Sequence, residues 1–318
     1  MKIWEGEENM AIRSLKSQIN YAITKNAHIG ESKRSYRNQH DGKTNGRTFS
    51  VGYTEVLRDC ANSFSKYIKA EHPDIRMAKE ITTRVVQQWI DYNKDKWSNA
   101  TTNNRISQMQ VIAQQINSTY KGADIHLDEL KNNKDQKRDD KIRDKAMDRK
   151  DYEAIRYNLQ QSQSQARHAI EIAGRNGLRI KEISCLKTKN IDLEKNVLHI
   201  TEGAKNGKYR DVPIREMDRN YYLSLKKELE NMKQEYVCGG VKEDSLNRAI
   251  RSEMKQLGLN RKYEKTTNHA IRKMYARERM EEERSNGKSE EKAWSIVQKE
   301  LGHGSGFRQA LYKTYIGK

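Results

Sequence analysis

The sequence lacks the features that would place it in a membrane or in an oxidising compartment. No apolar run approaches the roughly 20 residues that a membrane helix needs, and the opening MKIWEGEENM lacks the basic-then-apolar order of a signal peptide. The three cysteines, Cys60, Cys185 and Cys238, are far apart, odd in number and without a CxxC pair, which indicates neither a disulfide framework nor a zinc site. We therefore expect a cytoplasmic protein with reduced thiols and no membrane contact.

Motifs of nucleotide-dependent and metal-dependent enzymes are also missing. The sequence has no GxxxxGK[ST] loop, and it has no dense cluster of carboxylates of the kind that a magnesium-dependent nuclease uses. We expect no cofactor and no bound metal.

What the sequence has in excess is positive charge. Lys and Arg number 62 against 44 Asp and Glu, a net charge of +18, and such an excess points to a polyanionic partner, most often nucleic acid. A solvated basic surface would give the same excess, so charge alone leaves both interpretations open. Only 34% of residues are hydrophobic, but they recur at helical spacing, so a polar, helix-rich protein of two domains is expected.

The first half of the chain predicts a small helical bundle. Helical periodicity covers residues 11–27, 53–70, 77–95 and 98–120, and Ser98 or Thr101 could cap the last of these helices. A loose basic segment is expected after the first helix, and the almost wholly charged stretch 131–150 is typical of an exposed linker. The predicted organisation is a helix and basic segment over 1–45, a helical domain over 46–130, a linker over 131–150 and a second domain over 151–318.

The second half of the chain predicts short strands as well as helices. A helical region with a glycine break at GRNG is followed by short strands within residues 191–214, divided by turn residues, and helices return from residue 216. The predicted fold class is mainly α with a small antiparallel β-sheet in the C-terminal domain.

Four spaced motifs in this half contain residues that could take part in catalysis. They are Gly177-Leu178-Arg179 followed by Glu182; Lys205, with Lys208 as a competitor, between two strands; His269-x-x-Arg272; and Leu-Gly-His303 followed by Tyr312 and Tyr315. Each is common alone, but in this order, and with strands on both sides of the lysine, the set resembles the tyrosine recombinases, also called phage-type integrases.

The resemblance implies a site-specific recombinase of a mobile element, which cleaves and rejoins DNA through a covalent 3′-phosphotyrosine. Guanidinium groups bind phosphate oxygens in planar, bidentate geometry, so two arginines suit a pentacoordinate transition state. In the roles that the family implies, Arg179 and Arg272 clamp the scissile phosphate, Lys205 protonates the leaving 5′ oxygen, His269 assists proton transfer, His303 bonds the phosphate, and Glu182 supports the site.

The same resemblance implies the partners. They are double-stranded DNA at a specific site, a homotetramer of the chain on that DNA and accessory DNA-bending proteins, with the protein bound to the nucleoid. By pattern alone, residues 46–130 are similar to the family's core-binding domain and residues 151–318 to its catalytic domain. The alternative is a recombinase-like regulator that binds DNA without cleaving it.

Two tyrosines compete for the role of nucleophile. Tyr312 lies nine residues after His303, which is the commoner gap in the family, and Tyr315 lies twelve after it. Gly304 and Gly306 suggest a lengthened loop, and the Tyr-Ile-Gly ending at Tyr315 resembles that of several integrases. We favour Tyr315 and keep Tyr312 as the alternative. The polar stretch 281–294, between the third and fourth motifs, is expected to be a surface insertion.

Overall fold

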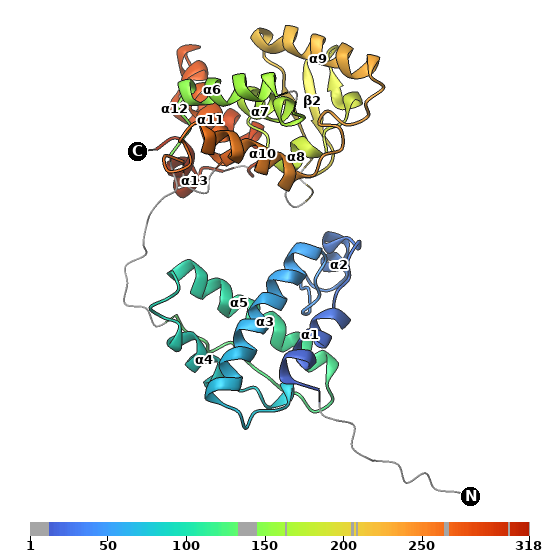
Figure 1. Ribbon diagram of the computed structural model, residues 1–318, viewed down its shortest axis with the longest axis vertical. Coiled ribbons are helices and arrows are strands. Elements are labelled where there is room, and N and C mark those ends of the chain that lie inside the picture. Colours follow the sequence, from blue (N-terminus) through green and yellow to red (C-terminus); the bar gives the residue numbers. More distant parts are fainter. Residues whose placement is uncertain are drawn as a thin grey trace, which may run out of the picture. The chain divides into compact units, whose positions relative to one another are not determined.

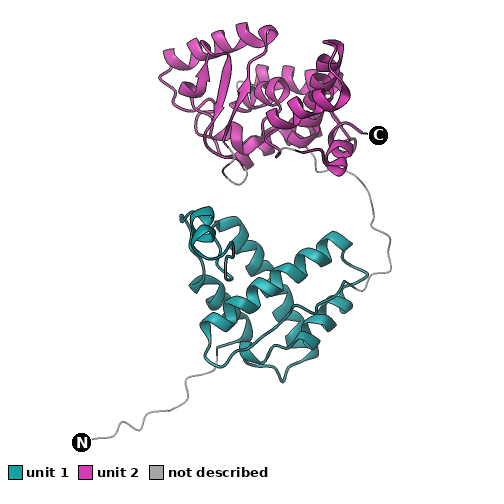
Figure 2. Cartoon of the chain, turned by 180° about the vertical axis from the view of Figure 1, so that it is seen from behind, with its two compact units in different colours: residues 1–140 teal, residues 141–318 magenta. Residues whose placement is uncertain are grey.

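The chain divides into two compact units, residues 1–140 (unit 1) and 141–318 (unit 2) (Figure 1; Figure 2). Each has its own hydrophobic core and is described by itself. The structure is a computed structural model, which describes residues 13–132, 145–162, 164–204, 207, 209–263, 267–304 and 306–317.

Unit 1 is helical. Its core lies where α1 packs against α3 and α5, and it includes the buried side chains of Ile19, Leu57, Phe64 and Ile112. The α-helices described there are α1 (Leu15–Lys25), α2 (Lys33–Gln39), α3 (Val51–Glu71), α4 (Thr83–Tyr92) and α5 (Asn99–Thr119).

Side-chain hydroxyls determine where these helices begin. Each cap accepts a hydrogen bond from the backbone N–H three residues later, which satisfies a donor that the first helical turn leaves open: Ser14 for α1, Ser50 for α3, Thr82 for α4 and Ser98 for α5. Of the two caps considered for α5, Ser98 is therefore the one used. The helix predicted from residue 77 begins only at Thr83, because Thr82 caps it and Ala78–Glu80 form a separate 3-10 turn.

The basic segment after α1 is not loose. It contains α2, and Tyr36 of that helix is buried, with its ring stacked on His40 at a centroid distance of 3.9 Å and the Arg47 guanidinium 4.7 Å from its centroid. The backbone N–H of His28 donates to the carbonyl of Thr48 at 2.7 Å, which joins the two ends of the segment.

Unit 2 combines helices with a small sheet, and the predicted fold class is confirmed. Within the described residues three antiparallel strands lie in the order β1-β2-β3, and buried Leu198 of β2 faces buried Val212 of β3. The strands are β1 (Ile191–Asp192), β2 (Val197–Ile200) and β3 (Arg210–Pro213). The α-helices are α6 (Arg149–Gln161), α7 (Ala166–Asn176), α8 (Ile180–Ser184), α9 (Arg219–Asn231), α10 (Glu243–Gln256), α11 (Thr267–Ser285), α12 (Glu290–Glu300) and α13 (Gln309–Tyr315).

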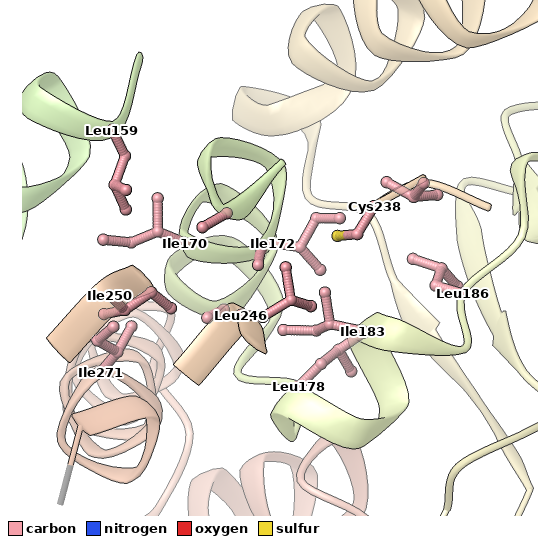
Figure 3. Close-up of a cluster of buried hydrophobic side chains, with 14 of the residues drawn as sticks. Leu159, Ile170, Ile172, Leu178, Ile183, Leu186, Cys238, Leu246, Ile250 and Ile271 are labelled. Carbon is pink, nitrogen blue, oxygen red and sulfur yellow. The ribbon is translucent and has the colours of Figure 1, made fainter. Parts of the chain in front are cut away.

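The main core of unit 2 gathers side chains from segments that are far apart in the sequence. Helix α11 lies against α7, and α10 contacts α6, α7 and α8. Figure 3 shows part of this core, with Leu159, Ile170, Ile172, Leu178, Ile183, Leu186, Cys238, Leu246, Ile250 and Ile271 labelled. Because Leu178 and Ile183 are buried in it, the short segment that contains Arg179 is held between them.

The stretch 281–294, expected to be a surface insertion, is mostly exposed, but part of it is buried. These residues form the end of α11, a turn and the start of α12, and Ala293 and Trp294 are buried in a second core of unit 2. Glu283 is buried as well, because it forms ion pairs with Arg279 and Lys288.

The described part of the chain has no helix that is long and apolar enough to cross a membrane. The three cysteines are free thiols, and burial raises the pKa of Cys60 to about 11 and that of Cys238 to about 12.

Candidate active site

Arg272 lies at the centre of the candidate site. It is on α11 and is fully buried, and its guanidinium donates hydrogen bonds to three oxygens: Nε to the hydroxyl of Tyr315 at 3.0 Å, Nη1 to the carbonyl of Gly177 and Nη2 to the carbonyl of Leu301. Burial lowers the pKa of Arg272, and the nearby positive charge of Arg179 lowers it further, while Tyr315 raises it. A buried cation therefore joins three separate segments of unit 2.

Gly177 allows the close approach of α7 to α11. It ends α7 in the left-handed conformation with φ of +59°, which glycine adopts without steric cost. A Cβ at this position would overlap the ring of Tyr275 on α11. The amide of Asn268 also donates to the carbonyl of Leu178 at 3.1 Å, so α11 binds two consecutive carbonyls of this turn.

Tyr315 is the tyrosine that contacts Arg272. Its hydroxyl is also 3.2 Å from Nε2 of His303, and the two rings meet edge to face with centroids 5.3 Å apart. The side chain is only 6% exposed, packed among Trp294 and other residues of the second core. Nε of Arg277 donates to the Tyr315 carbonyl at 3.1 Å, which holds the C-terminal end of α13.

Tyr312 makes different contacts, although it is on the same short helix. Its hydroxyl donates to Oε1 of Glu290 at 2.6 Å, and its ring meets Trp294 edge to face at 5.3 Å. Burial and the hydrogen bond to Glu290 raise the pKa of Tyr312 to about 12. The structure thus brings Tyr315, and not Tyr312, to Arg272 and His303.

Arg179 is held at the start of α8 by a buried carboxylate. Glu182 accepts a hydrogen bond from the backbone N–H of Arg179 at 2.8 Å and another from its Nη1 at 3.0 Å. Burial raises the pKa of Glu182, but the hydrogen bonds and charge of Arg210 and the backbone of Arg179 outweigh it, so the pKa is lowered. Glu182 is therefore ionised and can fix the Arg179 side chain, of which 17% is exposed.

His269 and Lys205 complete the predicted set. His269 lies three residues before Arg272 on α11, and its side chain is exposed. Lys205 and its competitor Lys208 lie outside the described residues.

Sequence reasoning missed Arg210, the first residue of β3. Its Nη1 and Nη2 donate to the two oxygens of Glu182 at 2.9 and 3.1 Å, and its Nε donates to the carbonyl of Glu300 at 2.8 Å. A signal was present, because Arg210 has the same strand phase as Val212 and Ile214, both buried. An arginine at an inward-facing strand position requires a buried acceptor.

Sequence reasoning also missed a buried polar cluster on Glu300, just before the turn at Leu301–His303. Its carboxylate accepts a hydrogen bond from the Tyr275 hydroxyl at 2.7 Å and ion-pairs with Arg279 at 3.2 Å. This cluster anchors the segment that positions His303. In the part of the chain that the structure describes, no group of three or more His, Cys, Asp or Glu side chains could hold a metal ion.

Comparison with known proteins gives one family and several similar structures. The model of the phage integrase family matches residues 145–307, more than half of the chain. A XerH site-specific recombinase bound to difH substrate is similar, at 16% identity and a TM-score of 0.61, with 96% of this chain and 90% of that chain covered. A lambda integrase(75–356) dimer bound to a COC′ core site is also similar, at 17% identity and a TM-score of 0.59, with 90% and 95% covered.

A third similar structure is the Tn1549 transposon integrase in complex with a circular intermediate DNA, at 15% identity and a TM-score of 0.53, with 94% of both chains covered. At these identities the likeness is one of fold. No curated protein matches the chain by sequence.

Proposed function

Since the chain belongs to the phage integrase family, the tyrosine recombinases, we propose that it is a site-specific DNA recombinase in which Tyr315 is the nucleophile. The observation that carries the proposal is the position of the Tyr315 hydroxyl, 3.0 Å from Nε of Arg272 and 3.2 Å from Nε2 of His303. A nucleophile needs a neighbouring group that can take its proton and a cation beside the phosphate that it attacks. As the sequence resemblance implies, we also propose that the DNA that it recombines is that of a mobile element.

In the proposed step, Tyr315 Oη attacks the scissile phosphorus. The Oη–P bond forms as the P–O5′ bond breaks, the phenol proton passes to Nε2 of His303, and the 5′ oxygen takes a proton from Lys205. The phosphodiester energy is kept in the phosphotyrosine, so a second 5′-hydroxyl can reverse the step without ATP. This assigns His303 to the tyrosine, whereas the sequence assigned it to the phosphate.

Charge neutralisation comes from the two arginines. Three of the five N–H donors of Arg272 are bound to Tyr315, Gly177 and Leu301, and the side chain is fully buried. Contact with a phosphate therefore requires a local opening next to Tyr315, in which the phosphate takes the remaining donors or replaces one of the acceptors. Arg179 completes the clamp from the start of α8, where Glu182 already orients it.

The proposed partner is duplex DNA, and the proposed assembly on it is a homotetramer. The net charge of +18 supports an electrostatic contribution to DNA binding from the chain as a whole. One of the solved structures with this fold is a lambda integrase tetramer bound to a Holliday junction, at 17% identity and a TM-score of 0.55. As the resemblance implies, we further propose that accessory DNA-bending proteins join this assembly and that the DNA-bound protein is associated with the nucleoid.

Covalent capture tests this function. The full chain first selects a duplex from a random-sequence DNA library, and the selected duplex is then nicked, so that the short cleaved strand diffuses away and the reaction cannot reverse. With EDTA and without ATP, the wild type should give a protein–DNA complex that survives SDS. If it binds the selected duplex but gives no such complex, the non-catalytic regulator is the correct function.

A further inference from the structure

Arg210 joins three segments of unit 2 through one guanidinium. Its two Nη atoms bind both oxygens of Glu182 near the start of α8, and its Nε binds the carbonyl of Glu300 at the end of α12. The residue itself is the first of β3, five positions after Lys205 in the sequence. Its side chain is 10% exposed, and that of Glu182 is fully buried.

The segments that Arg210 joins carry residues of the proposed site. Glu182 orients Arg179 by two hydrogen bonds, and Glu300 directly precedes Leu301, whose carbonyl accepts from Arg272. The turn is packed tightly on Arg210, because a Cβ on Gly302, which has φ of +66°, would lie 2.7 Å from Nη1 of Arg210. A shift of the Arg210 guanidinium would therefore be transmitted to both arginines of the clamp.

We infer that Arg210 is a positioning residue for DNA cleavage, an inference that rests on the proposed function. It acts through Glu182 on Arg179 and through residues 300–302 on Arg272 and His303. A planar guanidinium fork is required, because a lysine ammonium at this position is a point charge that cannot hold both carboxylate oxygens and the Glu300 carbonyl in fixed geometry.

The test compares two DNA linkages in single-turnover cleavage. The wild type first maps the scissile phosphate in the selected, nicked duplex, and a methylphosphonate is then placed at that position. A methylphosphonate has one non-bridging oxygen replaced by a methyl group and is neutral. Its cleavage therefore depends less on charge neutralisation by Arg179 and Arg272. A residue that positions the clamp should matter more for the charged phosphodiester than for the neutral linkage.

Arg210→Met should leave the affinity for the selected duplex unchanged. It should slow cleavage of the phosphodiester on the order of 10²-fold, the usual effect of a displacement of about 1 Å in a catalytic group. The loss on the methylphosphonate should be at least about tenfold smaller, because the clamp acts on the phosphate charge. Arg210→Lys should show the same pattern and serves as the test if Arg210→Met does not fold.

Arg156→Met is the matched control. Arg156 is on α6, and its Nη1 forms an ion pair with the buried carboxylate of Glu171 at 2.9 Å. Its described side-chain partners, Glu153 and Glu171, do not contact Glu182, Glu300 or Tyr275. Arg156→Met therefore removes an ion pair to a buried carboxylate away from the clamp, and its effect on the rate should be the same for both linkages.

Two outcomes would overturn the inference. One is cleavage by Arg210→Met and Arg210→Lys at the wild-type rate, and the other is an equal loss on both linkages, as for a general defect of folding. A wild type that cleaves neither linkage would instead overturn the proposed function, so the two failures are distinguishable.

Discussion

Substitution of Gly177 by alanine should damage the site through sterics alone. Alanine in the left-handed conformation costs about 1–2 kcal/mol, and the overlap of its Cβ with the ring of Tyr275 adds about 1–3 kcal/mol of overpacking. We therefore expect Gly177→Ala to lower the free energy of unfolding of unit 2 by about 2–5 kcal/mol. Because the Gly177 carbonyl accepts from Arg272, cleavage should fall as well.

Gly258→Ala separates the two contributions. Gly258 has φ of +69°, and no atom lies within 4 Å of the position that a Cβ would occupy, so alanine there meets only the conformational cost. The loss of unfolded-chain entropy on replacing glycine is common to both variants and cancels in their difference. Amide hydrogen exchange of the slowest amides of α11 in the full chain measures the opening free energy. If Gly177→Ala is no more destabilised than Gly258→Ala, the packing described for the α7–α11 contact is incorrect.

Three further predictions address charge. Arg279→Met should destabilise unit 2 by about 3–5 kcal/mol, because it leaves buried Glu300 without its cation. Arg149→Met, which removes the more exposed ion pair with Glu278, should cost about 0–1 kcal/mol. Amide hydrogen exchange of α11 measures both losses. Hydrogen bonds to Asp211 and Asp192 raise the pKa of His199 above 6.5. The stability that protonated His199 contributes to the fold is therefore complete below pH 6.5 and is lost as the pH rises through the raised pKa. The melting temperature should fall across that window more in the wild type than in His199→Gln, and equal profiles would contradict the assignment. Binding to any duplex should weaken steeply with salt in an anisotropy titration, because phosphate contacts release counterions, and a flat response would refute a phosphate-based interface.

The sequence predicted the helices where local signals determine them. Ser98 was recognisable as a cap for α5 because its hydroxyl and the apolar stripe that follows are neighbours in the chain. The polar composition of 281–294 predicted exposure, which most of these residues have, but it could not predict the buried ones. Burial of Glu283 depends on ion pairs, and burial of Trp294 depends on a core that only the fold assembles. Charged residues were taken as exposed, and paired buried charges are the exception to that rule.

The candidate site could be predicted in its residue types more readily than in its contacts. Spacing could not decide between Tyr312 and Tyr315, because residues three apart share a helical face. The structure separates them through partners distant in sequence, Glu290 for Tyr312 and Arg272 for Tyr315. Arg210 was missed for the same reason, since its acceptors lie 28 residues before it and 90 residues after it.

The identity of the tyrosine that becomes attached to DNA tests the central claim most directly. The trapped complex is digested with protease and nuclease, and tandem mass spectrometry locates the nucleotide on the C-terminal peptide. We predict a phosphodeoxynucleotide on Tyr315 in the wild type, the same adduct in Tyr312→Phe, and none in Tyr315→Phe, which should still bind the selected duplex. An adduct on Tyr312, or on neither tyrosine, would contradict the proposed active site.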